Sequence, residues 1–374
     1  MVVRAAAAPL IMLTAGGTGG HVFPAEALAE ELMQCGYRLA LATDRRGQAY
    51  GGVLGRVETF RIRAGGIAGR GLSSKIKAVV DLGLGTIQAL QLIRRMKPAV
   101  VVGFGGYASL PAMLAALLLG VPAMLHEQNA VLGRANRVLA SRVRRIATSF
   151  RHVKFIDSSD KRIACTGMPV RPAILNESEK PYPAMDDNGR ISILVMGGSQ
   201  GAKALSEMVP DALARLPETL RARLKVSQQS RPESLALSRA AYMRAGIDAE
   251  CESFFADIPA RLAASHLVIS RAGASSVAEI ACIGRPALLI PYRYAIDDHQ
   301  TANAQELDEA GGGWLMREDT LSAEALAGRL SQLLSNPSTL VRSAACAKAV
   351  GQPDAARKLA DLVLELVPQH LEVT

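Results

Sequence analysis

The chain has 374 residues, of which 49% are apolar and 4% aromatic, and its formal charge is +9. This length predicts two domains, and the apolar fraction argues against disorder, a collagen and a disulfide scaffold. The charge is unevenly divided, because residues 1–175 hold 23 basic and 9 acidic residues (+14), whereas residues 176–374 hold 20 and 25 (−5). The basic half favours a polyanionic partner: nucleic acid, anionic membrane or phosphorylated substrate. A solvated basic surface is the alternative.

The cysteines and histidines carry no metal-binding or disulfide pattern. None of the five cysteines forms a C-x-x-C pair, and their odd number is typical of reduced, mostly buried thiols in a cytoplasmic protein. The six histidines include no H-E-x-x-H motif. We therefore expect no metal and no cofactor.

Two apolar segments resemble membrane elements. Residues 4–13 resemble a weak signal peptide, but they lead directly into the glycines of 16–20, and cleavage would separate a strand from its loop. Residues 99–125 lack charge and are long enough to span a bilayer. Glycines and prolines divide that segment into a strand at 100–102, a helix at 111–119 and a strand at 122–125, so we expect a buried unit and no transmembrane helix.

The chain contains two similar halves. A strand at 10–13, a glycine loop at 16–20 and a helix begin the first half, and a strand at 191–196, a glycine loop at 197–201 and a helix at 202–209 begin the second. Further apolar strands alternate with amphipathic stretches, which predicts parallel sheets covered by helices. The Pro- and Asn-rich segment 172–190 is the expected linker. We predict an α/β protein with two Rossmann-like domains, residues 1–175 and 176–374, and an interdomain cleft.

Three glycine loops, at 16–20, 103–106 and 197–201, follow predicted strands. Backbone N–H groups and a helix N-terminus at such loops bind phosphate, although any single loop could be only a tight turn. The motif G-x-G-x-x-G is not satisfied and no P-loop motif is present. Asp44, after the next strand, lies where a ribose-binding acid would lie and favours a dinucleotide enzyme.

Two polar segments also follow apolar strands. Segment 271–279 supplies a loop, hydroxyls and then Glu279, whose carboxylate could accept hydrogen bonds from a ribose diol or simply favour the helix N-terminus. Segment 126–129 reads His-Glu-Gln-Asn, and such groups are costly to bury without a purpose. A capping or interdomain hydrogen-bond network is the alternative.

These motifs occur in a fixed order and together resemble the MurG family of bacterial N-acetylglucosaminyltransferases. The ordered set comprises Gly16–His21, Gly105–Tyr107, His126–Asn129, Pro169–Arg171, Gly197–Ala202 and Ala274–Glu279. The resemblance implies a GT-B fold, with the last helix packed back on the N-terminal domain. It implies inverting transfer of N-acetylglucosamine from UDP-GlcNAc to the C4 hydroxyl of lipid I, the undecaprenyl-pyrophosphoryl-MurNAc-pentapeptide, at the cytoplasmic face of the inner membrane. Proteins of cell-wall synthesis are further expected partners.

The resemblance also implies roles for individual residues. A histidine titrates near working pH, and His21 is expected to act as the base or to orient the acceptor; a hydrogen-bonding role at the helix start is the alternative. The UDP-GlcNAc site is expected to comprise Gly17, Thr18, Gly19, Asn129, Arg171, Ser199, Gln200, Phe255, Ala274, Ser275, Ser276, Glu279 and Gln300. The acceptor side is expected to comprise Gly105, Gly106, Tyr107 and His126.

The chain departs from the family's motifs at Met168, at Ala130, at 228–231 and at 298–299. These departures affect the expected details of donor geometry and not the family resemblance. Alternatives to this function are a GT-B transferase with another acceptor, a UDP-sugar 2-epimerase, a dinucleotide-dependent oxidoreductase and a nucleotide-binding module without activity. The basic residues of 61–97 flank apolar ones, which favours an anionic membrane surface over an ordinary packed helix. Neither half shows a nucleic-acid-binding motif, so no nucleic acid partner is expected.

Overall fold

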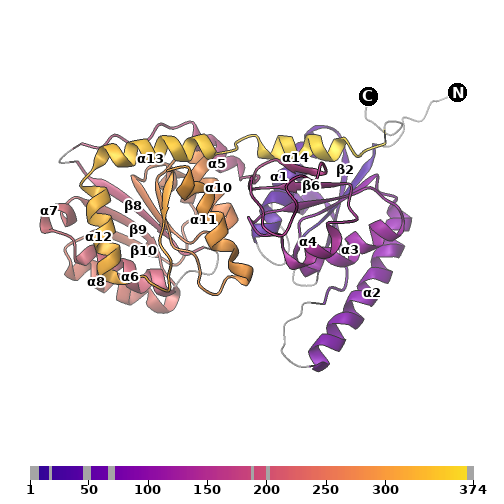
Figure 1. The fold of residues 1–374 in the computed structure, drawn as a ribbon, viewed down its shortest axis with the longest axis horizontal. Coiled ribbons are helices and arrows are strands. Elements are labelled where there is room, and N and C mark those ends of the chain that lie inside the picture. Colours follow the sequence, from indigo (N-terminus) through magenta and orange to yellow (C-terminus); the bar gives the residue numbers. More distant parts are fainter. Residues whose placement is uncertain are drawn as a thin grey trace. The chain divides into compact units, whose positions relative to one another are not determined.

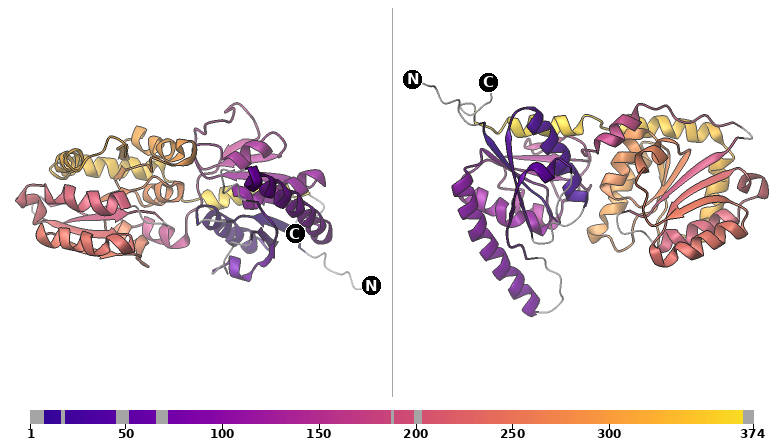
Figure 2. Two further views of the ribbon diagram at one scale, coloured as in Figure 1. Left: turned by 90° about the horizontal axis from the view of Figure 1, so that it is seen from below. Right: turned by 180° about the vertical axis from the view of Figure 1, so that it is seen from behind.

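The computed structural model describes residues 8–16, 19–44, 52–65, 72–186, 189–198 and 203–368. The chain divides into two compact units, shown in Figures 1 and 2. Unit 1 comprises residues 1–170 and 354–374, and unit 2 comprises residues 171–353.

Unit 1 is built on a seven-stranded parallel sheet with the order β3-β2-β1-β4-β5-β6-β7. The first six strands follow the Rossmann order 3-2-1-4-5-6, whose switch point lies between β1 and β4. The strands are β1 (Leu10–Thr14), β2 (Arg38–Thr43), β3 (Glu58–Arg61), β4 (Val100–Gly103), β5 (Ala123–Glu127), β6 (Arg145–Thr148) and β7 (Ile163–Cys165). The helices are α1 (Gly19–Gln34), α2 (Leu72–Met96), α3 (Gly106–Leu118), α4 (Arg134–Leu139) and α14 (Ala355–Leu364).

Both faces of the unit 1 sheet are buried, which explains why its central strands are almost entirely apolar. On one face, Ile11 and Leu13 of β1 pack with α1 and α14. On the other face, Leu10 and Met12 pack with α2 and α3. The alternation of these four residues between the two cores follows from the period of two along a strand.

Unit 2 repeats the same topology with six parallel strands in the order β10-β9-β8-β11-β12-β13. The strands are β8 (Ile191–Met196), β9 (Leu224–Gln229), β10 (Asp248–Glu252), β11 (Leu267–Ser270), β12 (Ala287–Leu289) and β13 (Gly313–Leu315). The helices are α5 (Pro172–Ser178), α6 (Lys203–Ala214), α7 (Glu218–Arg221), α8 (Leu235–Arg244), α9 (Ile258–Ala263), α10 (Ala274–Ile283), α11 (His299–Glu309), α12 (Ala323–Leu334) and α13 (Pro337–Val350). Two Rossmann-like units, predicted from the repeated strand and glycine-loop pattern, are thus present.

The division between the units falls after Val170, rather than after residue 175 as expected. The physical reason is that α5, which contains residue 175, packs on α9 and α10 of unit 2. The chain returns to unit 1 at Asp354, and Leu359 and Val363 of α14 join the apolar core around α1.

The charge-free segment 99–125 forms β4, α3 and β5, with both strands inside the sheet. The helix begins at Gly106, earlier than the expected position 111, and carries Pro111 inside it. Among the described residues, one helix is long and apolar enough to cross a membrane by length and composition, Ile76–Met96 within α2. The sequence interpretation, which tested residues 99–125, missed that property of α2.

Candidate active site

Three loops of unit 1 leave the carboxyl ends of β1, β4 and β5, neighbouring strands around the Rossmann switch point. His21 lies in the first turn of α1, and Gly106 begins α3. A Cβ atom at Gly106 would lie 3.4 Å from His21 Nε2, and Gly106 has a φ of +72°. The backbone conformation at 106 therefore favours glycine, and a side chain at this position would contact the imidazole.

The His21 ring is hydrogen-bonded to the segment after β5. His21 Nδ1 lies 2.8 Å from Gln128 Oε1. The other end of the same amide, Gln128 Nε2, lies 2.9 Å from both the backbone carbonyl oxygen and Nδ1 of His126. His126 is fully buried, and this burial is the main cause that lowers its pKa to about 4. The structure thus brings together His21 and His126, two residues expected in the site, through Gln128, which was not assigned a role.

Glu127 stabilises the loop that follows. Its buried carboxylate accepts hydrogen bonds from the backbone N–H groups of Asn129 and Gly133 and from Nδ2 of Asn136. A Cβ atom at Gly105 would lie 3.2 Å from that Asn136 amide. The polar segment therefore has two parts: Glu127 supports the loop structure, as the capping alternative anticipated, while His126 and Gln128 face His21.

Tyr107 and Asn129 complete the residues expected on this side. Tyr107 is half-buried in the first turn of α3, next to Gly106, and Asn129 is half-buried directly after β5. Gly19 is the first residue of α1. Gly17 and Thr18 lie outside the described residues, as do Ser199 and Gln200 of unit 2.

In unit 2, the predicted ribose-binding acid is engaged by the predicted donor-site arginine. Arg171 Nε and one of its terminal nitrogens lie 2.9 Å and 3.0 Å from the two carboxylate oxygens of Glu279. Burial of Glu279 raises its pKa, and the Arg171 guanidinium opposes that rise. Glu279 lies in α10, whose first residues are Ala274, Ser275 and Ser276, so its carboxylate shares a helix with three other residues expected to bind the nucleotide.

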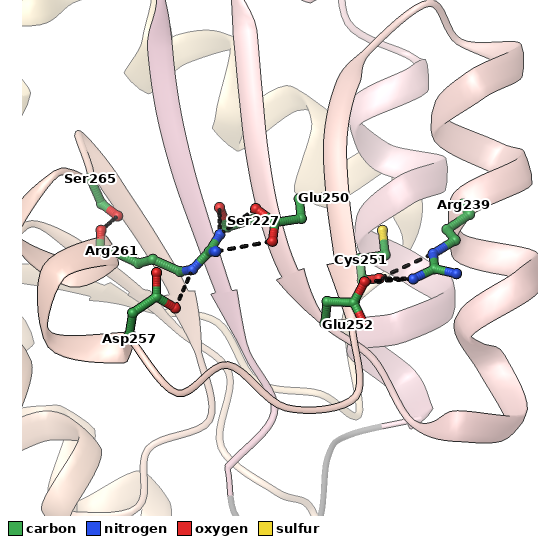
Figure 3. A network of polar contacts seen from close by, with 8 residues as sticks. All are labelled: Ser227, Arg239, Glu250, Cys251, Glu252, Asp257, Arg261 and Ser265. Carbon is green, nitrogen blue, oxygen red and sulfur yellow. Dashed lines mark hydrogen bonds and ion pairs between the residues drawn. The ribbon is translucent and has the colours of Figure 1, made fainter.

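The loop after β10 holds the aromatic residue expected at the uracil. Phe255 is 5% exposed, and the Arg261 guanidinium carbon lies 4.1 Å from its ring centroid. Figure 3 shows how Arg261 is held: it contacts the carboxylates of Glu250 and Asp257 at 2.6 Å and 2.8 Å and the hydroxyl of Ser227 at 3.0 Å. The preceding Phe254 is 73% exposed. The sequence interpretation missed Arg261 of α9. It also missed the exposed Phe254, because a loop gives no periodicity that indicates which ring faces inward.

Gln300 lies in the first turn of α11 and contacts the loop that follows β12. Its Oε1 accepts a hydrogen bond from the Tyr292 backbone N–H at 2.9 Å. Arg271 forms a buried ion pair with Glu318 at 2.8 Å, and the same carboxylate accepts from the Arg293 backbone N–H at 3.0 Å. The sequence interpretation gave Arg271 no role beyond the start of a motif. Its ion-pair partner, Glu318, lies 47 residues away, and residue spacing does not reveal such a pair.

Two of the departures from the family's motifs lie in packed surroundings. Gln228 is fully buried in unit 2, where its amide is hydrogen-bonded to the hydroxyls of Ser230 and Tyr242. Met168 is buried in unit 1, and its sulfur lies 3.4 Å from the Ser149 hydroxyl. Within the described ranges, no group of three or more His, Cys, Asp or Glu residues is arranged to hold a metal ion.

Comparisons with known proteins cover nearly all of the chain. The N-terminal domain model of glycosyltransferase family 28 matches residues 11–148, and the C-terminal domain model of that family matches residues 192–359.

Two similar curated relatives carry the name UDP-N-acetylglucosamine--N-acetylmuramyl-(pentapeptide) pyrophosphoryl-undecaprenol N-acetylglucosamine transferase. One from Paramagnetospirillum magneticum is 59% identical over 97% of this chain and 98% of its own length. One from Rhodospirillum rubrum is 54% identical over 95% of this chain and 92% of its own. The crystal structure of Acinetobacter baumannii MurG is 30% identical, covers 96% of this chain and 99% of its own, and has a TM-score of 0.77. The chain therefore belongs to this transferase family, the MurG family of glycosyltransferase family 28, and has its GT-B fold.

Proposed function

We propose that this protein transfers N-acetylglucosamine from UDP-GlcNAc to the C4 hydroxyl of lipid I, with inversion at the anomeric carbon, and so forms lipid II in peptidoglycan synthesis. The observation that carries the substrate assignment is the 59% identity, over 97% of the chain, to a relative named for this transfer. The site residues are consistent with such chemistry, because unit 1 contains a histidine beside a phosphate-type glycine loop and unit 2 contains a ribose-type carboxylate on a helix.

At the anomeric carbon, the transfer makes one bond and breaks one. The C4 hydroxyl oxygen of the acceptor attacks the anomeric carbon of GlcNAc, and the bond from that carbon to the β-phosphate oxygen breaks, so UDP leaves with the electron pair. The hydroxyl proton passes to His21, since histidine is the residue type that most often acts as a general base. On the donor side, Glu279 accepts hydrogen bonds from the ribose hydroxyls, and the first amides of α10 face the nucleotide.

The direct test is to incubate the purified protein with labelled UDP-GlcNAc and a short-chain lipid I analogue. We expect UDP release that requires the acceptor and a disaccharide product with a β linkage. UDP release without dependence on the acceptor would exclude lipid I as the acceptor. Binding of NADH without binding of UDP would instead favour the oxidoreductase that Asp44, buried after β2, first suggested.

We also propose that unit 1 binds the anionic cytoplasmic face of the inner membrane through α2. One face of α2 packs on α3, with Ala89 and Ile93 buried. The other face carries exposed apolar side chains, and Figure 1 shows its N-terminal half extending beyond α3. These side chains are Ile76 (57% exposed), Val79 (68%), Val80 (53%), Leu84 (40%) and Ile87 (54%).

An apolar helix face flanked by cations is typical of a helix that lies in the membrane interface rather than one that crosses it. Lys77, Arg94 and Arg95 supply exposed cations on α2. Each cation near an anionic surface contributes about 1 kcal/mol to binding. Binding to other proteins of cell-wall synthesis stays a prediction.

Vesicle co-sedimentation tests the membrane proposal. We expect binding to vesicles that contain anionic lipid, and binding that weakens as salt rises, because salt screens the cations. Val79→Asp should weaken binding strongly. Leu237→Asp is the matched control, since Leu237 is 65% exposed but lies in unit 2. Equal binding by both variants would contradict the assignment of α2.

A further inference from the structure

The orientation of the Gln128 side-chain amide is fixed by its surroundings. Gln128 Nε2 lies 2.9 Å from the backbone carbonyl oxygen of His126, which can only accept a hydrogen bond. Turning the amide over would place two oxygens against each other in a buried position, at a cost comparable to a lost buried hydrogen bond. The NH2 group therefore faces His126, and Oε1 faces His21.

This orientation determines which nitrogen of His21 carries the proton. Gln128 Oε1 lies 2.8 Å from His21 Nδ1, and an amide oxygen only accepts. Nδ1 must therefore be the N–H donor. In a neutral imidazole the other nitrogen is then unprotonated, so the lone pair of His21 is on Nε2.

The same amide fixes His126 in the opposite tautomer. Its NH2 group lies 2.9 Å from His126 Nδ1, so that nitrogen accepts and the His126 proton is on Nε2. His126 Nε2 lies 3.4 Å from the Ser149 hydroxyl, which in turn faces the Met168 sulfur. The adjacent Glu127 carboxylate is occupied by the loop that follows it. Burial keeps His126 neutral, so that its Nδ1 stays an acceptor for the amide.

The second ring nitrogen of His21 lies beside Gly106. A Cβ atom at position 106 would lie 3.4 Å from His21 Nε2, at the short end of ordinary van der Waals contact. The nitrogen with the lone pair is thus the one beside the glycine loop after β4.

We propose that Gln128 is a positioning residue that holds His21 as the Nδ1–H tautomer, leaving Nε2 to accept the proton of the acceptor hydroxyl. This inference rests on the proposed function for its catalytic meaning, although the tautomer itself does not depend on activity. The geometry also assigns His126 a part, since it holds the amide from the other side through its backbone carbonyl and its Nδ1.

The tautomer can be measured directly by NMR of the ¹⁵N-histidine-labelled protein. The chain contains six histidines, and the His21 signals are the pair lost in a His21→Asn variant. We expect the His21 Nδ1 shift in the protonated range and the Nε2 shift in the unprotonated range. A wild-type protein with the proton on His21 Nε2 would overturn the proposal, and this measurement needs no variant of Gln128.

Gln128→Met tests the consequence for turnover, because methionine keeps the length of the side chain and removes the acceptor oxygen. We expect His21 to lose its fixed tautomer and kcat to fall about tenfold or more, within the roughly 10²- to 10⁴-fold that a general base contributes. The KM for UDP-GlcNAc should change little. Gln332→Met is the control, since Gln332 is an exposed glutamine of α12 in unit 2, and this variant should alter neither the His21 shifts nor kcat.

Failure of this inference differs from failure of the proposed function. If Gln128→Met keeps both the His21 tautomer and kcat, the positioning role is wrong while the transferase function stands. If the wild-type protein shows the Nδ1–H tautomer but releases no UDP with lipid I, the positioning geometry stands and the proposed reaction is wrong.

Discussion

Arg171 donates two parallel hydrogen bonds, of 2.9 Å and 3.0 Å, to the carboxylate of Glu279. The two residues are 108 positions apart in the sequence but belong to the same folded unit. Arg171 immediately precedes α5, and Glu279 lies in α10, the helix on which α5 packs. The pair therefore joins the first residue of unit 2 to the helix proposed to bind the nucleotide. The two parallel hydrogen bonds fix the direction of this buried carboxylate.

Replacing Glu279 should weaken donor binding. Glu279→Ala removes the carboxylate proposed to accept from the ribose hydroxyls, and hydrogen bonds to a charged group contribute about 1.5–3 kcal/mol, or roughly a 10- to 100-fold change in affinity. Titration calorimetry with UDP-GlcNAc measures this change. Glu233→Ala, in an exposed ion pair of the same unit, serves as the control. Unchanged affinity in Glu279→Ala would refute the ribose contact.

Removing Arg171 should make donor binding more sensitive to acid. Burial already raises the pKa of Glu279, and Arg171 is the group that opposes this rise. In Arg171→Ala the pKa of Glu279 rises further, so the carboxylate becomes protonated at a higher pH. The loss of UDP-GlcNAc affinity as pH falls should therefore begin at higher pH than in the wild type. Overlapping curves of Kd against pH would show that Arg171 does not act through Glu279.

Replacing His21 should affect turnover rather than donor affinity. In His21→Ala we expect kcat to fall roughly 10²- to 10⁴-fold, because the proposed contribution is made in the transition state. The affinity for UDP-GlcNAc should remain unchanged. His152→Ala, in an exposed loop of the same unit, should retain full kcat. A His21→Ala enzyme with normal kcat and weakened donor binding would reverse the assigned role.

Two glycines offer a matched pair for the site. Gly106 and Gly120 have almost the same φ, +72° and +71°, but of these two only Gly106 lies beside His21. Each Gly→Ala change should cost about 1–2 kcal/mol of stability through left-handed strain. Only Gly106→Ala should also lower kcat, because the space around Gly120 is open. Equal effects on kcat, measured alongside unfolding, would argue against crowding of the imidazole.

The buried His126 should make unit 1 less stable in mild acid. Its folded pKa of about 4 lies below the ordinary 6.5. Between these values the unfolded chain binds a proton that the folded chain does not, so stability falls as pH is lowered from about 6.5 to 4. The full loss is about 3 kcal/mol, at 1.36 kcal/mol for each pH unit.

Hydrogen exchange of the β4 and β5 amides measures this effect, because the single tryptophan, Trp314, reports on unit 2. His126→Asn should flatten the pH dependence in that window. His152→Asn should leave it unchanged, since His152 is exposed. An undiminished slope in His126→Asn would mean that other groups cause the acid sensitivity.

Much of the fold could be predicted from local patterns. Apolar runs followed by glycine loops indicated the two Rossmann-like units, and the charge-free segment 99–125 was correctly interpreted as strand, helix and strand. Boundaries were less predictable. The units divide after Val170 rather than after residue 175, because α5 packs on α9 and α10, and no local pattern encodes that packing.

The site was predictable as a set of residues but not as a set of contacts. The run His-Glu-Gln-Asn suggested buried polar groups, yet its side chains contact different parts of unit 1. Glu127 faces its own loop, whereas Gln128 faces His21, 107 positions away. Such pairing depends on how strands are ordered in the sheet, and residue types and spacing do not specify it. Phe254 and Phe255 illustrate the same limit within a loop, where one ring is exposed and the next is buried.

The return of the chain at Asp354 has a consequence for how the protein is made. Residues 171–353 must be translated before α14 is synthesised. Translation of this segment takes about 10–40 seconds at roughly 5–20 residues per second. Until then, Leu28 and Leu32 of α1 lack the partners that Leu359 and Val363 supply in the finished protein. The nascent first unit therefore lacks the cover of this apolar surface, and a nonsense mutation between the first unit's sheet and α14 would leave the surface uncovered permanently.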